Sequence, residues 1–143
     1  MESDSINLDS YLTFLELDEF KVNRPEPSLD TLSKIVEKHA TKIHYQNVAL
    51  QLKYISGEPI VKEDLLISTI QNKLIDKKEG GMCYDINLLM EAALAALGFN
   101  VQLVSAFPMV LIPGKLPDHL ALVVQIESSY YIVDPGFGIN KLR

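Results

Sequence analysis

The chain has 143 residues, of which 48% are hydrophobic and 22% are charged, and its net charge is −6. This composition is not that of a disordered chain, and the acidic balance argues against a nucleic-acid backbone as the main partner, because such binders carry a basic patch. The acidic, serine-containing start and the lack of an apolar run of about 18 residues predict a cytoplasmic protein that is neither exported nor membrane-spanning.

The first two thirds of the chain show helical periodicity. After an amphipathic opening over residues 8–17, Ser28 is suited to cap a helix over residues 29–43, because its hydroxyl accepts hydrogen bonds from free amides. Further helices are expected over residues 62–76 and 84–97. Gly98 stands where a helix of this kind ends, and residues 43–59 read as irregular.

The remaining residues have the texture of strands. Three segments rich in Val, Ile, Leu and Tyr cover residues 99–107, 119–127 and 130–138. A loop broken by proline and glycine joins the first two, and the short Glu-Ser-Ser connection makes a hairpin of the last two. Helices followed by antiparallel strands predict an α+β fold: a helical domain over residues 1–97 and the start of an antiparallel sheet or barrel domain over residues 98–143.

Cys83 is the only cysteine, so it forms no internal disulfide and its thiol is available for chemistry. It lies at the predicted start of a helix, where free amides and the helix dipole stabilise a thiolate. Gly80 and Gly81 remove side-chain bulk in front of it, which allows a sharp turn and a close substrate approach. The same local pattern also fits a buried structural cysteine behind a glycine turn.

His119 begins one predicted strand and Asp134 ends the next. If the short turn pairs these strands, antiparallel geometry places the two residues at the same end of the hairpin. Asp134 is then able to orient the imidazole through one ring nitrogen while the other accepts the thiol proton, giving a cysteine-protease-like Cys-His-Asp core. His119 taken alone also fits an ordinary surface histidine.

The other histidines, His39 and His44, have simpler interpretations. His39 lies near the end of a helix, where a polar or cationic side chain suits the dipole, and His44 lies in a polar loop. No metal is expected, because Cys83 has no companion cysteine and no histidine spacing typical of a metal site occurs.

Four segments, taken in order, resemble the N-terminal half of the arylamine N-acetyltransferase family. PSLDTLSKIVEKHATKIHYQNV resembles the family's helix followed by its His and Pro-Phe-Glu-Asn-Leu segment, and GGMCYDIN resembles its Arg-Gly-Gly-x-Cys motif. HLALVVQI and YYIVDPGFG resemble its His and Asp-x-Gly-Phe-Gly strands. The resemblance covers nearly the whole chain.

This resemblance implies a ping-pong reaction with acetyl-CoA as cosubstrate. Cys83 accepts the acetyl group, and an aromatic amine or hydrazine then attacks the thioester. His119 deprotonates the thiol and Asp134 orients His119; a strongly paired Cys and His can also exist as thiolate and imidazolium. Tyr45 and Phe137 are expected to line the acceptor pocket, although each also fits core packing.

Three substitutions depart from the family pattern. Glu79 replaces the arginine before the cysteine and Gln46 replaces the glutamate, so a supporting ion pair is lost and the surroundings of the site are expected to differ. A Glu79 side chain close to Cys83 is expected to oppose ionisation of the thiol, since a nearby negative charge raises a thiol pKa. Pro135 removes a backbone amide after the aspartate. Family members are also about twice as long, so a fragment or a truncated relative is expected.

Two other functions fit the same residues. Cys, His and Asp in this chain order also serve amide chemistry, as in thiol hydrolases and transglutaminase-like enzymes. A degenerate family member that binds a small aromatic molecule or a protein through an open strand edge is the non-enzymatic alternative, favoured by Glu79 and Gln46.

Overall fold

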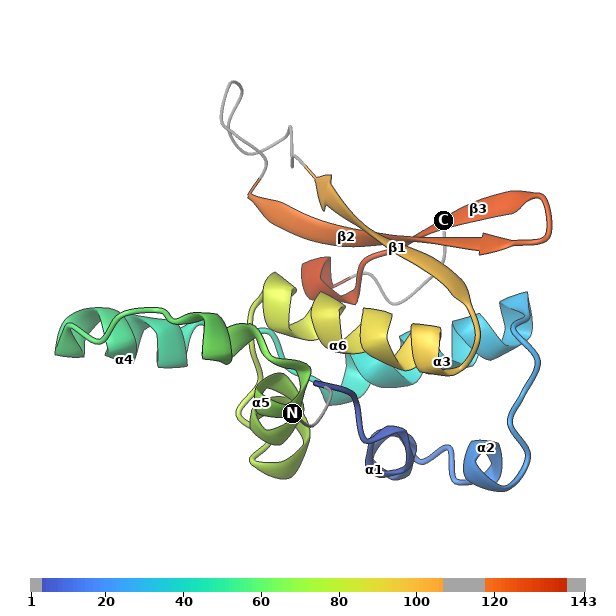
Figure 1. The fold of residues 1–143 in the computed structure, drawn as a ribbon, viewed down its shortest axis with the longest axis horizontal. Helices are drawn as coiled ribbons and strands as arrows, with labels where there is room; N and C mark the ends of the chain where they lie inside the picture. The colour runs from blue at the N-terminus through green and yellow to red at the C-terminus, as the bar shows by residue number, and fades with distance from the viewer. Residues whose placement is uncertain (1–3, 107–117, 139–143) are drawn as a thin grey trace.

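The computed structural model describes residues 4–106 and 118–138. The helices of this part are α1 (Leu8–Phe14), α2 (Glu19–Val22), α3 (Leu29–Lys42), α4 (Val48–Ser56), α5 (Ile67–Gln71) and α6 (Cys83–Ala96). Three short helical turns are η1 (Lys62–Leu65), the π-helical η2 (Asn72–Asp76) and η3 (Pro135–Phe137), and the strands are β1 (Asn100–Ala106), β2 (His119–Ile126) and β3 (Ser129–Val133). Helices thus precede an antiparallel sheet, as predicted (Figure 1).

The centre of the core is α6, which packs against α1, α5 and the strands β1 and β2. Its predicted apolar face is buried along the whole helix: Ile86, Leu89, Met90, Ala93, Leu94 and Leu97. Gly98, with φ +86°, adopts the left-handed conformation that ends the helix, as its position in the sequence predicts. Because helices and strands share this core, the proposed division between residues 97 and 98 stays a prediction.

The sheet has the order β1-β2-β3, and both pairings are antiparallel. A tight turn at Glu127 and Ser128 joins β2 to β3, with Ile126 opposite Ser129. This confirms the hairpin expected from the sequence. Ala106 pairs with His119, so β1 flanks the end of β2 at which the hairpin opens. Most of the predicted loop between β1 and β2 lies outside the described residues.

One predicted helix is divided in the structure. Residues 62–76 form η1, α5 and η2 in place of a single helix, because Leu66 has an extended backbone with ψ 138°. The Asp4 carboxylate accepts hydrogen bonds from the free amides of Ile67 and Ser68, so a distant residue provides the cap of α5.

Another helix was not predicted. Residues 43–59 read as irregular, yet Val48–Ser56 form α4, which ends at Gly57 with φ +74°. Figure 1 shows α4 projecting from the body of the molecule. Several of its large apolar side chains, including Leu52 and Ile55, are exposed. The helix therefore does not pack an apolar face against the core, which is the arrangement that the usual helical sequence pattern reflects.

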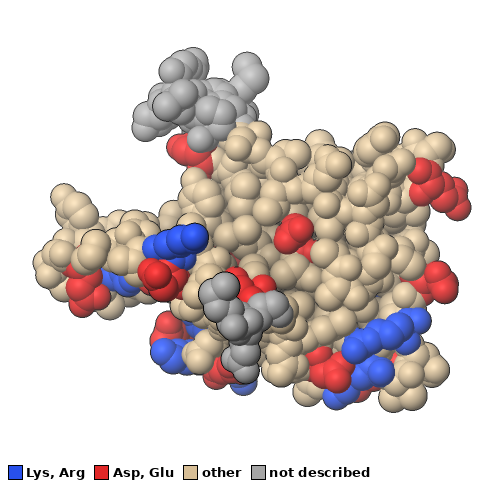
Figure 2. Space-filling model, in the orientation of Figure 1, with Lys and Arg blue, Asp and Glu red and all other residues tan. Residues whose placement is uncertain are grey.

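Charged side chains of both signs are interspersed over the helical part of the face in Figure 2, while the part formed by the sheet is largely uncharged. Lys21, Arg24 and Lys38 each pair with a carboxylate. Within residues 4–106 and 118–138, no helix is long and apolar enough to cross a membrane.

Candidate active site

Cys83 is the first residue of α6 and is 6% exposed. Met82, in an extended conformation, is the N-cap residue, and its amide donates to the Asp85 carboxylate at 2.9 Å. The preceding Gly80 has φ +72°, and a Cβ on it would lie 2.4 Å from the His44 carbonyl oxygen. The glycine turn and the helix start around Cys83 therefore have the form that the sequence predicts.

His119 and Asp134 lie at the same end of the hairpin. His119 Nε2 donates to Asp134 Oδ2 at 2.7 Å, and both side chains are 10% exposed. The antiparallel register explains the contact, because His119 begins β2 and Asp134 follows β3 directly. Since Nε2 is engaged by the carboxylate, Nδ1 is the ring nitrogen left to exchange a proton with another group.

Asn87 joins this pair to α6 and was not identified from the sequence. It is fully buried, and its Nδ2 donates to Asp134 Oδ1 at 3.0 Å and to the Leu120 carbonyl oxygen. Its Oδ1 accepts from the Gly136 amide at 2.9 Å. The available signal was its position four residues after Cys83, which places both side chains on one face of the helix.

Gly136 allows the strand end to approach the helix. A Cβ there would lie 2.8 Å from Cys83 Cα and 2.9 Å from Asn87 Nδ2, closer than any unstrained contact. Pro135, which departs from the family pattern, is buried at the first position of η3, where a missing amide costs no helical hydrogen bond. The sequence Asp-Pro-Gly-Phe therefore packs directly against the start of α6.

The surroundings of Cys83 act on the pKa of its thiol in both directions. Burial raises the pKa of the Cys83 thiol above its ordinary value, and the negative charge of Asp134 raises it further. The backbone N–H groups of Leu120 and Tyr84 act in the opposite direction, so the sulfur lies beside the residue that follows His119. The raised pKa favours a neutral thiol in the resting protein and does not support a preformed thiolate–imidazolium pair.

The two aromatic residues expected at the acceptor pocket lie on opposite flanks of this arrangement. The Phe137 ring packs edge-on against His119 with 5.4 Å between ring centroids, and Phe137 is 54% exposed. Tyr45 is 57% exposed and forms an isolated parallel bridge with Gly81. Both are accessible to a ligand rather than packed in the core; their binding role stays a prediction.

A cleft of about 820 Å³ lies between α4 and α5 and reaches the start of α6. Met82, Tyr84 and Asp85, which surround Cys83 in sequence, form one part of its wall. Neither Tyr45 nor Phe137 lines it. Among the described residues, no group of three or more His, Cys, Asp or Glu side chains is arranged to hold a metal ion.

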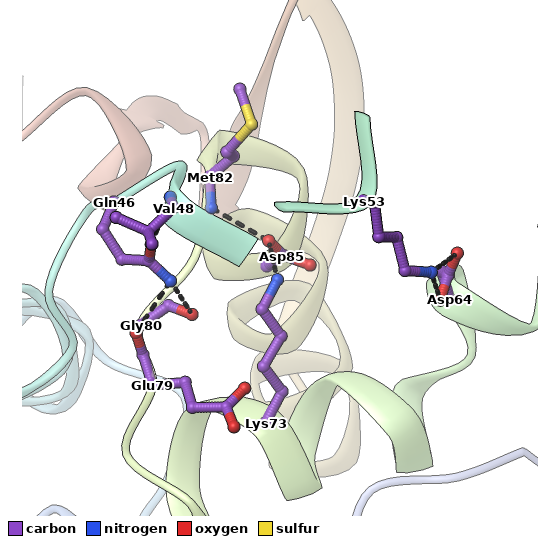
Figure 3. A network of polar contacts seen from close by, with 9 residues as sticks. All are labelled: Gln46, Val48, Lys53, Asp64, Lys73, Glu79, Gly80, Met82 and Asp85. Carbon is purple, nitrogen blue, oxygen red and sulfur yellow. Dashed lines mark hydrogen bonds and ion pairs between the residues drawn. The ribbon is translucent and has the colours of Figure 1, made fainter. Parts of the chain in front are cut away.

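The substituted pair Gln46 and Glu79 is connected in a new way (Figure 3). Gln46 Nε2 donates to the backbone carbonyl oxygens of Glu79 and Gly80 at 2.8 and 3.3 Å. The Glu79 side chain is exposed, and in Figure 3 it extends toward Lys73. The carboxylate whose charge raises the Cys83 pKa is that of Asp134, and an influence of Glu79 on the thiol stays a prediction.

His39 is a core residue and not a partner of the helix dipole. It is fully buried, with Nδ1 2.8 Å from the Tyr11 hydroxyl oxygen and Nε2 3.1 Å from the Ile86 carbonyl oxygen. Burial lowers the pKa of His39 to about 3, so it is neutral in the folded protein. His44 is exposed in a loop, as expected.

Comparison with known proteins identifies the family. The sequence model of the N-acetyltransferase family matches residues 28–143. The arylamine N-acetyltransferase of Mycolicibacterium smegmatis is 33% identical over 144 residues, covering 96% of this chain and 49% of the relative. The Salmonella typhimurium arylamine N-acetyltransferase structure superposes with a TM-score of 0.77 at 26% identity, covering 100% of this chain and 49% of the other. The Mycobacterium marinum enzyme in complex with CoA gives a TM-score of 0.71 at 29% identity, covering 92% and 46%.

The fold and the match together define an α+β protein with the fold of the solved arylamine N-acetyltransferases. The chain belongs to the arylamine N-acetyltransferase family. It spans about half the length of the curated relatives it matches, and it corresponds to their N-terminal half. These findings confirm the family and the fold class predicted from the sequence.

Proposed function

We propose that this chain transfers an acetyl group from acetyl-CoA to an aromatic amine, hydrazine or hydroxylamine by a ping-pong mechanism through an acetyl-Cys83 thioester. Family membership supports this reaction class, and one related structure contains CoA. The observation that carries the proposal is the 2.7 Å contact between His119 Nε2 and Asp134 Oδ2 beside the start of the helix that begins with Cys83.

In the first half-reaction the thiol loses its proton as it attacks. Because the pKa of the Cys83 thiol is raised, His119 Nδ1 acts as a general base and accepts the proton while Sγ bonds to the acetyl carbonyl carbon. The Leu120 and Tyr84 amides stabilise the negative charge that develops on sulfur. The bond between the carbonyl carbon and the CoA sulfur then breaks, and the CoA thiolate leaves with the proton from His119.

In the second half-reaction the acceptor nitrogen attacks the acetyl-Cys83 carbonyl carbon. The carbon–sulfur bond breaks, the amide product leaves, and the amine proton returns to Sγ through His119. The Asp134 carboxylate, bonded to Nε2, stabilises the imidazolium that forms in each half-reaction. We expect an aromatic acceptor ring to stack on Phe137, because this side chain is exposed and packs on His119.

The proposal is tested by incubating the full chain with acetyl-CoA and measuring its intact mass, with Cys83→Ser as the matched control. One acetyl group on the wild type and none on the variant is the expected result. An arylamine added afterwards should remove the acetyl group and appear as the N-acetyl product.

Other outcomes separate the alternatives. An acetyl adduct that water removes as fast in the absence of an amine as in its presence identifies a thiol hydrolase. A folded wild-type chain that acquires no adduct contradicts the proposal and leaves the non-enzymatic binder. Equal acetylation of Cys83→Ser shows that the modified residue is not Cys83.

A further inference from the structure

Residues 79–82 lead into Cys83. In each of them a backbone N–H or C=O group is hydrogen-bonded to a residue outside this segment. Gln46 holds the middle of this segment. Its Nε2 donates to the carbonyl oxygens of Glu79 and Gly80, and its own amide donates to the Gly81 carbonyl oxygen at 2.9 Å. As a neutral amide, Gln46 satisfies carbonyls that an anionic glutamate, which has only acceptors, is unable to satisfy.

Lys73, in the π-helical turn η2, is hydrogen-bonded directly to the beginning of the segment and is connected to its end through Asp85. Its carbonyl oxygen accepts from the Glu79 amide at 3.0 Å, and its Nζ donates to Asp85 Oδ2 at 2.9 Å. The same Asp85 oxygen accepts from the Met82 amide at 2.9 Å (Figure 3). One lysine is thus connected to the beginning of the segment through its backbone and to its end through the Asp85 carboxylate. Single π-helical turns are frequent at functional sites.

The Lys73–Asp85 pair is shielded from water and has little freedom. The two side chains are 26% and 13% exposed, which distinguishes the pair from the surface ion pairs of this chain, such as Lys34–Asp30 with 55% and 78%. A Cβ on Gly81 would lie 2.6 Å from Asp85 Oδ2, so the glycine makes room for the carboxylate. Removing one partner of such a pair leaves a poorly solvated charge, which is costly.

We propose that Lys73 is a positioning residue for Cys83, acting through Asp85 and the segment 79–82. The cation comes from η2 and the anion from the first turn of α6, while Gln46 holds the turn as a neutral donor. This inference rests on the proposed function only in taking Cys83 as the nucleophile.

The position of the thiol depends on this clamp. Cys83 directly follows Met82, whose amide is held by Asp85, so loss of the Lys73 cation loosens the helix start and leaves the Asp85 charge without its partner. A nearby unpaired negative charge opposes thiolate formation. The titratable groups that act on the thiol from the neighbouring elements are Asp134, with His119 bonded to it, and Tyr84, and all three are left unchanged in the experiment below.

Because the chain has one cysteine, alkylation by iodoacetamide reports on Cys83 alone and requires no acetyl donor. The rate is measured as a function of pH for the wild type, Lys73→Met, Lys73→Arg and the control Lys77→Met. Lys77 is exposed and, like Lys73, lines the cleft between α4 and α5. Lys73→Met is expected to slow alkylation near neutral pH by about three- to tenfold and to move the midpoint of the pH profile upward by up to about one unit. Lys73→Arg should restore most of the rate, and Lys77→Met should match the wild type.

A second variant keeps the proposal testable if Lys73→Met does not fold. Asp85→Asn removes the charge but retains an oxygen that can accept from both the Met82 amide and Lys73 Nζ, so the helix start stays held and Cys83 should react at least as fast as in the wild type. Wild-type kinetics in folded Lys73→Met, an equal loss in Lys77→Met, or slower alkylation in folded Asp85→Asn would each overturn the proposal. If Lys73→Met slows alkylation as expected but acetyl-CoA does not acetylate the wild type, the result counts against the transferase reaction and not against the role of Lys73.

Discussion

Two histidines approach α6 from different sides and have different surroundings. His39, from α3, is fully buried between the Tyr11 hydroxyl and the Ile86 carbonyl oxygen. His119, from β2, bonds to the Asp134 carboxylate. That carboxylate also accepts a hydrogen bond from Asn87, the residue after Ile86 in α6. Ile86 and Asn87 are adjacent, so neighbouring residues of one helix serve a structural and a candidate catalytic histidine.

The difference lies in the partners and not in the presence of hydrogen bonds. The partners of His39 are uncharged, and burial lowers its pKa to about 3, so it holds no extra proton at neutral pH. His119 has an anionic partner that stabilises an imidazolium. A buried histidine with two hydrogen bonds therefore says little about function until the charge of its partners is known.

Exchanging the two histidines for glutamine is expected to give the largest contrast. His119→Gln removes the proposed general base and should slow acetylation of Cys83 by about 10²- to 10⁴-fold. His39→Gln should leave the rate of the folded protein within a few fold. Intact-mass measurement of acetyl loading checks both variants, and similar losses in the two would show that the distinction is wrong.

Asp134→Asn should change thiol acidity and catalysis in opposite directions. Removal of the carboxylate lowers the pKa of the Cys83 thiol, because the Asp134 charge is one cause of the upward shift. Acetyl loading should nevertheless slow by roughly 10²-fold, since His119 loses the group that orients it. Alkylation against pH and acetyl loading measure the two effects, with the exposed Asp118→Asn as the control. A parallel rise in both rates would contradict the orienting role.

His39→Leu should mainly affect stability. It removes the histidine partner of the buried Tyr11 hydroxyl, which keeps only a 3.9 Å bond to the Met90 sulfur, and it removes the bond to the Ile86 carbonyl oxygen. The expected loss in the free energy of unfolding is about 2–4 kcal/mol, measured by urea denaturation. His44→Leu, at an exposed loop position, should change it by less than about 0.5 kcal/mol. A small effect at both positions would show that the buried hydrogen bonds contribute little.

The same buried histidine predicts a pH dependence of stability. Its pKa is about 3 in the folded state and near its ordinary 6.5 in the unfolded chain, so only the unfolded chain binds a proton between these values. The contribution of neutral His39 is complete above about pH 6.5 and is lost as the pH falls toward 3. The free energy of unfolding should be about 2 kcal/mol smaller at pH 5 than at pH 8 through His39 alone.

This contribution is isolated by comparison with His39→Leu. Carboxylates with lowered pKa values, such as Glu16, also lose stability in acid, but they do so in both proteins. The difference between the two stability profiles therefore belongs to His39. Parallel profiles from pH 8 to pH 5 would mean that His39 is protonated in the folded state.

The smallest effect is expected at the aromatic side chain beside His119. Phe137→Ala should raise the KM for an arylamine acceptor by about three- to tenfold, with little change in acetylation by acetyl-CoA. The KM of Phe137→Leu for the arylamine should lie between those of the wild type and Phe137→Ala. Steady-state kinetics with varied acceptor and donor check this split, and an equal effect on both substrates would assign Phe137 to the support of His119 instead.

Local sequence predicted the elements that carry the candidate site. The apolar spacing of α6 and the glycines before Cys83 were sufficient to place Cys83 at the start of a helix. The short turn between β2 and β3 was sufficient to place His119 and Asp134 at one end of a hairpin. These features depend on backbone preferences and on side-chain periodicity over a few residues, which a single sequence displays directly.

Contacts between distant segments were not predictable in this way. Asn87 contacts Leu120 and Asp134, which are 33 and 47 positions away, and its spacing of four residues from Cys83 does not by itself identify these partners. The break before α5 depends on Asp4, and the pairing of Lys73 with Asp85 depends on the turn between them. Each is decided by which segments pack together.

The sequence by itself determined the family, the α+β class and the three residues Cys83, His119 and Asp134 as candidates, because these follow from short motifs and local periodicity. Only the tertiary structure decided how the departures Glu79 and Gln46 are accommodated, and that burial and Asp134 raise the Cys83 pKa. The physical reason is that hydrogen-bond partners and solvation are properties of packed segments, whereas helix starts and hairpin turns are properties of the chain over a few residues.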